Sequence, residues 1–198
     1  MRDSVAAVHE LVTNISPLDS LESEHIADTL QWLEATDDVF RRSKPATPDR
    51  HLVSYAVLLD RDNFDVLLVD HVNSGLVLPP GGHVKPDEHP AAAARRECRE
   101  ELGIEASLTG GGIDPAFVTV TTTIGLDRGH TDVSLWFILE GSRDLELTLD
   151  EVEFGGARWW SLEEVTAADG ETFDPHFQRF MRKVSSSGSP AFRNPAIP

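Results

Sequence analysis

One short segment, residues 82–104, constrains the fold of this chain more than any other part of it. Its middle, Pro90–Leu102, begins with a proline and four alanines and is followed by Gly103. Proline suits a first helical turn, alanine favours helix, and glycine suits the position just past a helix end, so one helix is predicted. Just upstream, residues 78–82 (LPPGG) predict a strand that ends in a glycine-rich turn, where the backbone can approach a ligand closely.

On the predicted helix, an apolar stripe lies directly beside three carboxylates. The stripe consists of Ala91, Ala94, Cys98 and Leu102. At 3.6 residues per turn, Glu97, Glu100 and Glu101 fall within an arc of roughly 100° at its edge. Like charges at these spacings destabilise a helix unless they are neutralised, and hard divalent cations prefer carboxylate oxygens. The helix therefore predicts a magnesium site. A solvated acidic face is the alternative, which the preceding glycine turn disfavours.

The spacing of the fixed residues in this segment matches a family pattern. Gly82 to Ile104 follows G-x5-E-x7-R-E-U-x-E-E-x-G-U, where U is apolar. The segment resembles the Nudix hydrolases without a gap or substitution, although Cys98 is a less usual filler of its apolar position. If each of the seven fixed residues has a background usage of about 7 per cent, a chance match arises in on the order of one window in a hundred million.

The resemblance implies hydrolysis of a nucleoside diphosphate linked to another group X, with Mg²⁺ or Mn²⁺ as cofactor. It implies metal binding by the carbonyl of Gly81 and the carboxylates of Glu97, Glu100 and Glu101. It also implies that Gly82, Glu88, Arg96 and Gly103 brace the loop against the helix.

The resemblance does not fix which residue deprotonates the attacking water, because members of the family differ in this role. Glu97 is one candidate, and an acid from a later loop is the other. In the segment 150–153 we favour Glu153 over Glu151, against the alternative that both are solvated loop charges.

Three further residues are candidates for contact with substrate. His83 follows the glycine turn and is placed to touch a phosphate, and His130 lies in a glycine-flanked loop that could reach over the site. Trp136 could stack on a base. Each has a structural alternative, because lone histidines and aromatic residues in strand patterns are more often structural.

The substrate class is inferred by elimination among subfamilies of the resembled family. The ADP-ribose type often has a proline about fifteen residues beyond the motif, but Pro115 comes too early. The tyrosine of the diadenosine-polyphosphate type is missing, since Tyr55 is the sole tyrosine, and so is the SQPWPFPxS sequence of the NADH type. A MutT-like triphosphate pyrophosphohydrolase remains. A sugar-nucleotide pyrophosphatase, a non-catalytic nucleotide sensor and an isoprenoid diphosphate isomerase are the alternatives.

The amino-acid composition indicates which binding partners and which cellular compartment to expect. The formal charge of −17 over 198 residues argues against a nucleic-acid polymer or an anionic membrane as partner. The single cysteine excludes an intramolecular disulfide and suits a reducing compartment. No signal peptide or apolar run of about 20 residues is visible. We therefore expect a cytoplasmic protein that acts on a small nucleotide.

The periodicity of the chain predicts an α+β fold, with a mixed sheet between helices, and three parts. Residues 1–46 show helical spacing with an N-cap at Asp19, and they predict an extension that packs on the sheet, lids the site or forms a homodimer surface. The resemblance implies that residues 47–184 are the Nudix hydrolase domain. The pattern predicts strands there at 52–59, 64–69, 75–78, 116–123, 132–139 and 157–160 and a closing helix at 173–184. Residues 185–198 are rich in Ser, Gly and Pro and predict a loosely ordered tail.

Overall fold

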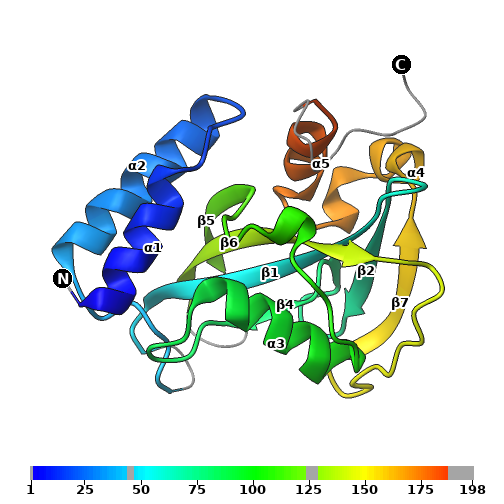
Figure 1. The fold of residues 1–198 in the computed structure, drawn as a ribbon, viewed down its shortest axis with the longest axis horizontal. Helices are drawn as coiled ribbons and strands as arrows, with labels where there is room; N and C mark the ends of the chain where they lie inside the picture. The colour runs from blue at the N-terminus through cyan, green and yellow to red at the C-terminus, as the bar shows by residue number, and fades with distance from the viewer. Residues whose placement is uncertain (1, 44–46, 124–128, 187–198) are drawn as a thin grey trace. The chain divides into compact units, whose positions relative to one another are not determined.

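The computed structural model describes residues 2–43, 47–123 and 129–186, and most of its helices and strands are labelled in Figure 1. Backbone contacts group the chain into two compact units. The first unit comprises Met1–Tyr55, Gly81–Arg96 and Ile113–Phe137, and the second comprises Ala56–Pro80, Glu97–Gly112 and Ile138–Pro198. Strand β1 (Arg50–Asp60), helix α3 (Pro90–Leu102) and strand β6 (His130–Gly141) contribute residues to both units. Within the described ranges, no helix combines the length and the apolar character that crossing a membrane requires.

Among the described residues, seven strands are hydrogen-bonded into one sheet. The other five strands are β2 (Asp65–His71), β3 (Leu76–Leu78), β4 (Gly81–His83), β5 (Phe117–Thr123) and β7 (Phe154–Trp160). The order of neighbours is β3-β2-β1-β6-β5, while β4 pairs with β1 and β7 pairs with β2. The predicted combination of a sheet with helices, including N-terminal helices, is confirmed.

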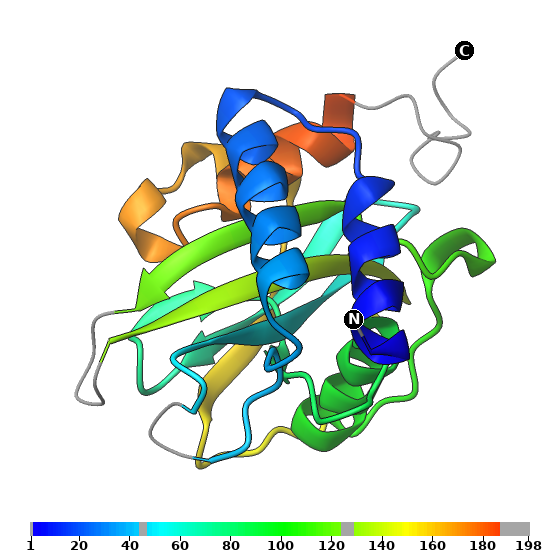
Figure 2. The same ribbon diagram turned by 90° about the vertical axis from the view of Figure 1, so that its left-hand side faces the viewer.

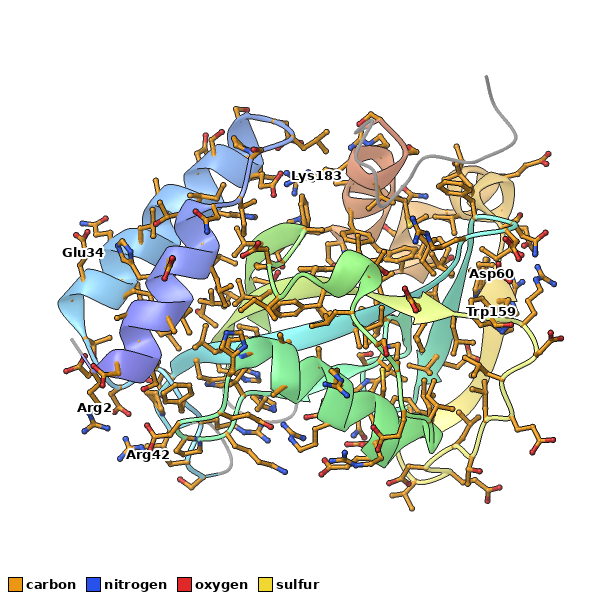
Figure 3. All side chains as sticks on the ribbon, in the orientation of Figure 1. Arg2, Glu34, Arg42, Asp60, Trp159 and Lys183 are labelled. Carbon is orange, nitrogen blue, oxygen red and sulfur yellow. The ribbon has the colours of Figure 1, made fainter. Side chains whose placement is uncertain are left out.

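In the first unit, helices α1 (Asp3–Thr13) and α2 (Ser20–Ala35) lie side by side (Figures 1 and 2). Arg2 and Glu34 mark the end of the pair where α1 begins and α2 approaches its end, so the two helices are antiparallel (Figure 3). Helix α2 packs against β5. The apolar side chains of α1 that the sequence placed on one face are all buried, namely Val5, Val8, Leu11 and Val12.

The N-cap predicted for α2 is present, with one difference in detail. The Asp19 side chain accepts a hydrogen bond from the Glu22 N–H at 2.9 Å. The Glu22 carboxylate reaches back to the N–H of Leu18 rather than to that of Asp19, and it is fully buried. The helix therefore begins where the sequence predicted, because two backbone N–H groups at its start are satisfied by side chains.

In the second unit, two element boundaries differ from the prediction. Strand β7 begins at Phe154 rather than Ala157, because Phe154 pairs with His71 of β2 and the two intervening glycines lie at a register shift in the pairing. After helix α4 (Leu162–Ala167) and a 3₁₀ turn (Gly170–Thr172), the closing helix α5 is Phe177–Ser186 instead of starting at residue 173.

The late start of α5 follows from the hydrogen bonds of Asp174. Its side chain accepts from the His176 N–H at 2.8 Å, and its carbonyl accepts from the Phe177 N–H at 2.9 Å. The Asp174 side chain thus satisfies a backbone N–H just before the helix, and Phe173 lies before Asp174. There Phe173 packs against the rings of Trp160 and Phe177.

Three predicted segments fall wholly or partly outside the described residues. They are the end of the predicted extension at 44–46, the glycine-flanked loop at 125–130 and the tail at 185–198. His130, predicted in that loop, is instead the first residue of strand β6. The predicted domain boundaries at residues 46 and 184 remain predictions.

The glycine turn predicted at the end of β3 is itself a strand, β4, in the first unit. Gly81, Gly82 and His83 pair with Tyr55, Ser54 and Val53 of β1. A Cβ atom on Gly81 would lie 2.5 Å from the Ser54 carbonyl oxygen and 2.7 Å from Cδ1 of Tyr55. The absence of a side chain at Gly81 is therefore what lets β4 approach β1 so closely.

We predict that Gly81→Ala destabilises the protein by about 1–3 kcal/mol, because the new methyl group meets a backbone oxygen that cannot move aside without distorting β1. Urea unfolding of the purified variant measures this. Gly112→Ala is the matched control, since a Cβ there meets nothing within 4 Å. Equal stability of the two variants would contradict the proposed close approach.

Candidate active site

Arg96 ties together three consecutive parts of the first unit. Its guanidinium donates from Nε to Oε1 of Glu88 at 2.8 Å and from Nη2 to Oε2 of Glu88 at 3.0 Å. Nη2 also donates to the carbonyl of His83 at 3.1 Å. One side chain of α3 thus holds the end of β4 and the loop that follows it, which is the contact expected of a bracing pair.

Glu88 is held in its ionised form by the same contacts. Burial opposes ionisation, but the hydrogen bonds from Arg96 and from the Lys85 N–H, together with the charge of Arg96, outweigh it and keep the pKa of Glu88 below its ordinary value. The loop that contains Glu88 is also held by helix α1, because the Ser4 hydroxyl donates a hydrogen bond to Asp87 at 3.3 Å.

The predicted apolar stripe of α3 is buried, and the three carboxylates beside it differ in exposure. Glu97 is 8% exposed and Glu101 is 6% exposed, whereas Glu100 lies on the solvent side. Burial, followed by the charges of Glu101 and Glu97, raises the pKa of Cys98 to about 12. Cys98 is therefore an inert, neutral core thiol, and two carboxylates one turn apart share its buried surroundings.

The end of α3 is capped by a later loop of the second unit. The N–H of Thr148 donates to the carbonyl of Leu102 at 2.8 Å, and that of Asp150 donates to the carbonyl of Glu101 at 3.2 Å. Gly103 ends the helix with a φ of 70°, as the sequence predicted, and a Cβ there would lie 3.0 Å from Cβ of Thr148. The loop from residue 148 is thereby fixed at the carboxylate-bearing turn.

Glu153 follows this loop in an exposed turn. Its N–H donates to the Asp150 carbonyl at 3.1 Å, and its own carbonyl accepts from the Val72 N–H at 3.0 Å. Burial lowers the pKa of His71, and the charge of Glu153 opposes that shift. The structure thus places Glu153 near His71, and its role as a base remains a prediction.

His83 and His130 are brought together in the first unit, with two residues that sequence reasoning missed. The His51 ring centroid lies 4.8 Å from that of His83 and 5.2 Å from that of His130, and Asp132 lies beside them. Burial, then the nearby positive charge of Arg41 and the neighbouring histidines, lowers the pKa of His83 to about 3 against the opposing charge of Asp132. The available signal was the H-x-D alternation at 130–132, which puts both side chains on one strand face.

Trp136 is enclosed by protein in the first unit. Its ring is fully buried and packs on Tyr55 and Phe117, and its Nε1–H donates to the Thr119 hydroxyl at 3.0 Å. This burial matches the structural role that the strand pattern also allowed for Trp136. Contact of Trp136 with a substrate base remains a prediction.

Comparison with known proteins relates the chain to one family. A family model described as NUDIX domain matches residues 49–180. Diphosphoinositol polyphosphate phosphohydrolase 3-alpha of Mus musculus is 31% identical over 119 residues, which cover 60% of this chain and 67% of the mouse protein.

Solved structures show a similar fold. The E. coli dihydroneopterin triphosphate pyrophosphohydrolase has a TM-score of 0.53 at 16% identity, covering 73% of this chain and 98% of the E. coli chain. A C. elegans Ap4A hydrolase in a binary complex has a TM-score of 0.52 at 18% identity, covering 68% of this chain and 94% of the other.

We predict that Glu88→Gln lowers the free energy of unfolding at pH 7 by about 1–3 kcal/mol, because Arg96 loses a charged, bidentate acceptor. The folded-state pKa of Glu88 is depressed, so this contribution is present above the unfolded-state pKa and is lost as the pH falls through the folded-state pKa. Urea unfolding measures the change at pH 7.

The control for this prediction is Glu105→Gln. Glu105 pairs with Arg99 at 3.3 Å on the exposed surface, so its loss is expected to change stability by less than about 0.5 kcal/mol. If Glu88→Gln behaves like Glu105→Gln, Arg96 does not brace the loop.

Proposed function

The chain belongs to the Nudix hydrolase family, and from this premise we propose that it hydrolyses a (deoxy)nucleoside triphosphate to the monophosphate and pyrophosphate by attack of water on phosphorus. The complete motif on an intact frame supports catalysis, and the choice of a triphosphate rests on the missing sequence marks of the other subfamilies. None of the motif's carboxylates is replaced, and the ion pair between Glu88 and Arg96 is formed. A sensor without catalysis needs no such complete set of acidic residues.

The carboxylates of α3 suit the divalent metal that the family uses. Glu97 and Glu101 are one helical turn apart and largely buried, and carboxylate oxygens are the ligands that Mg²⁺ and Mn²⁺ prefer. We assign metal binding to Glu97, Glu100 and Glu101, with the Gly81 carbonyl as a further ligand. Divalent ions bound there would activate water and balance the charge of the departing phosphate.

The remaining roles belong to the protein's own side chains. We assign proton abstraction from the attacking water to Glu97 or Glu153. Arg96 and Glu88 position the backbone of the loop and of α3 without touching the reacting atoms. The hydrogen bonds from Thr148 and Asp150 hold the last turn of α3, which supports the orientation of Glu101.

A second candidate substrate class comes from the relatives. The mouse relative is named for diphosphoinositol polyphosphates, which also carry a phosphoanhydride bond. Such a substrate is densely anionic, and this chain has a formal charge of −17. Long-range repulsion disfavours it more strongly than a nucleoside triphosphate, so the triphosphate is our first choice. Nucleoside diphosphate sugars remain the alternative among nucleotides.

We predict that Glu100→Gln and Glu101→Gln each lower turnover by at least about 100-fold while the fold persists, because each removes a charged metal ligand and keeps the side-chain size. Steady-state kinetics with Mg²⁺ measures turnover, and circular dichroism checks the fold. Glu163→Gln on α4 is the control and should keep full activity. Unchanged turnover in both motif variants would refute the metal assignment.

The substrate proposal is tested by measuring release of phosphate and pyrophosphate, with Mg²⁺ and Mn²⁺, from three classes of compound: nucleoside triphosphates, nucleoside diphosphate sugars and a diphosphoinositol polyphosphate. We expect pyrophosphate from at least one triphosphate. Hydrolysis confined to another class would contradict the triphosphate assignment, and no hydrolysis of any compound would favour a nucleotide sensor.

A further inference from the structure

Four metal-ligating side chains of the first unit gather on one face of its strands. His51 lies on β1 two residues before Val53, which pairs with His83 of β4, so both histidines face the same side of the sheet. His130 and Asp132 are two residues apart on β6, which neighbours β1. One ligand atom from each of these four side chains lies within 4.8 Å of the others.

The shortest distances in this cluster match the spacing of ligands around a small metal ion. Nε2 of His51 lies 3.1 Å from Oδ1 of Asp132, and Nε2 of His130 lies 3.4 Å from the same oxygen. With metal–ligand distances of about 2.0–2.1 Å, the edge of a tetrahedron is roughly 3.3 Å. The four side chains are therefore close enough to share one ion after a small contraction.

Several atoms of this cluster lack the hydrogen bonds that buried polar groups normally make. Among the residues that the structure describes, Nε2 of His51, Nε2 of His83 and Oδ1 of Asp132 are buried without a hydrogen-bond partner. His51 is fully buried. Its 3.1 Å contact with Asp132 does not have hydrogen-bond geometry. Such orphaned atoms are costly unless a ligand completes them.

The tautomer of His51 determines which of its two ring nitrogens can bind a metal. Nδ1 of His51 lies 2.9 Å from the carbonyl oxygen of Pro48, which can only accept, so Nδ1 carries the proton. In the neutral ring, Nε2 then has a lone pair directed into the cluster, where it meets an acceptor oxygen. A histidine whose second nitrogen donates to a backbone carbonyl is the usual arrangement of a metal ligand.

The backbone holds the three strands in place for this role. The Thr131 N–H donates to the carbonyl of Asp49 at 2.8 Å, which ties the start of β6 to the residue just before β1. The Val84 N–H donates to the Leu52 carbonyl at 3.1 Å, which ties β4 to the same strand. The ligand-bearing positions are therefore preorganised.

The geometry points to a second metal site, in which His51, His83, His130 and Asp132 bind one transition-metal ion of the zinc class. Three imidazoles with one carboxylate suit Zn²⁺, whereas Mg²⁺ prefers oxygen ligands. With four protein ligands the site is closed, as structural zinc sites are, and the ion would fasten β1, β4 and β6 together. His83 and His130 would then be ligands of a resident ion rather than direct contacts to a substrate phosphate.

The test uses the full chain, stripped of metal with a chelator and titrated with Zn²⁺ or Co²⁺ alone. We expect about one equivalent of Zn²⁺ per chain, a higher melting temperature with the ion, and the intense visible absorption of tetrahedral Co²⁺. Asp132→Asn and His130→Gln should each weaken binding by at least about 100-fold.

Two control variants separate this site from other ligands. His9→Gln removes a histidine of α1 outside the cluster, and Glu100→Gln removes a carboxylate of α3. Both should keep one equivalent of Zn²⁺ and the tetrahedral Co²⁺ spectrum, whether or not the chain hydrolyses nucleotides. The proposal is overturned if the unmodified chain binds no Zn²⁺, if Co²⁺ gives only a weak octahedral spectrum, or if Glu100→Gln abolishes binding that Asp132→Asn retains.

Discussion

The ion pair between Arg96 and Glu88 is the contact on which the frame of the first unit depends. A planar guanidinium makes two parallel hydrogen bonds to one carboxylate and a third to the carbonyl of His83. The pair is largely shielded from water, so salt and solvent weaken it less than a surface pair. Strand β4, the loop after it and the start of α3 are held in one arrangement by this single side chain.

Helix α3 carries core residues and carboxylates at adjacent positions. Its alanines, Cys98 and Leu102 pack in the core, while Glu97 and Glu101 are drawn into nearly the same degree of burial. Carboxylate oxygens at these positions suit the divalent cation proposed above. The raised pKa of Cys98 reflects first its burial and then the charges of Glu101 and Glu97.

Local signals in the chain predicted most elements, and their failures have physical causes. Pro90–Leu102 was predicted with its observed ends, because proline, alanine and glycine act on the nearest turn. Strand β4 and the start of β7 were missed, because two glycines together favour turns unless another strand supplies hydrogen bonds. The start of α5 was predicted too early, because the hydrogen bonds of Asp174 outweigh the apolar periodicity around Phe173.

The sequence by itself determined the family, the reaction class and the acidic residues of α3, because these depend on spacing within one continuous segment. Only the tertiary structure decided which of those carboxylates are buried, where Glu153 lies, and that the Trp136 ring is buried. It also decided that His51, His83, His130 and Asp132 meet. Those residues come from three strands far apart in the chain, and strand pairing, which no local pattern encodes, brings them onto one face.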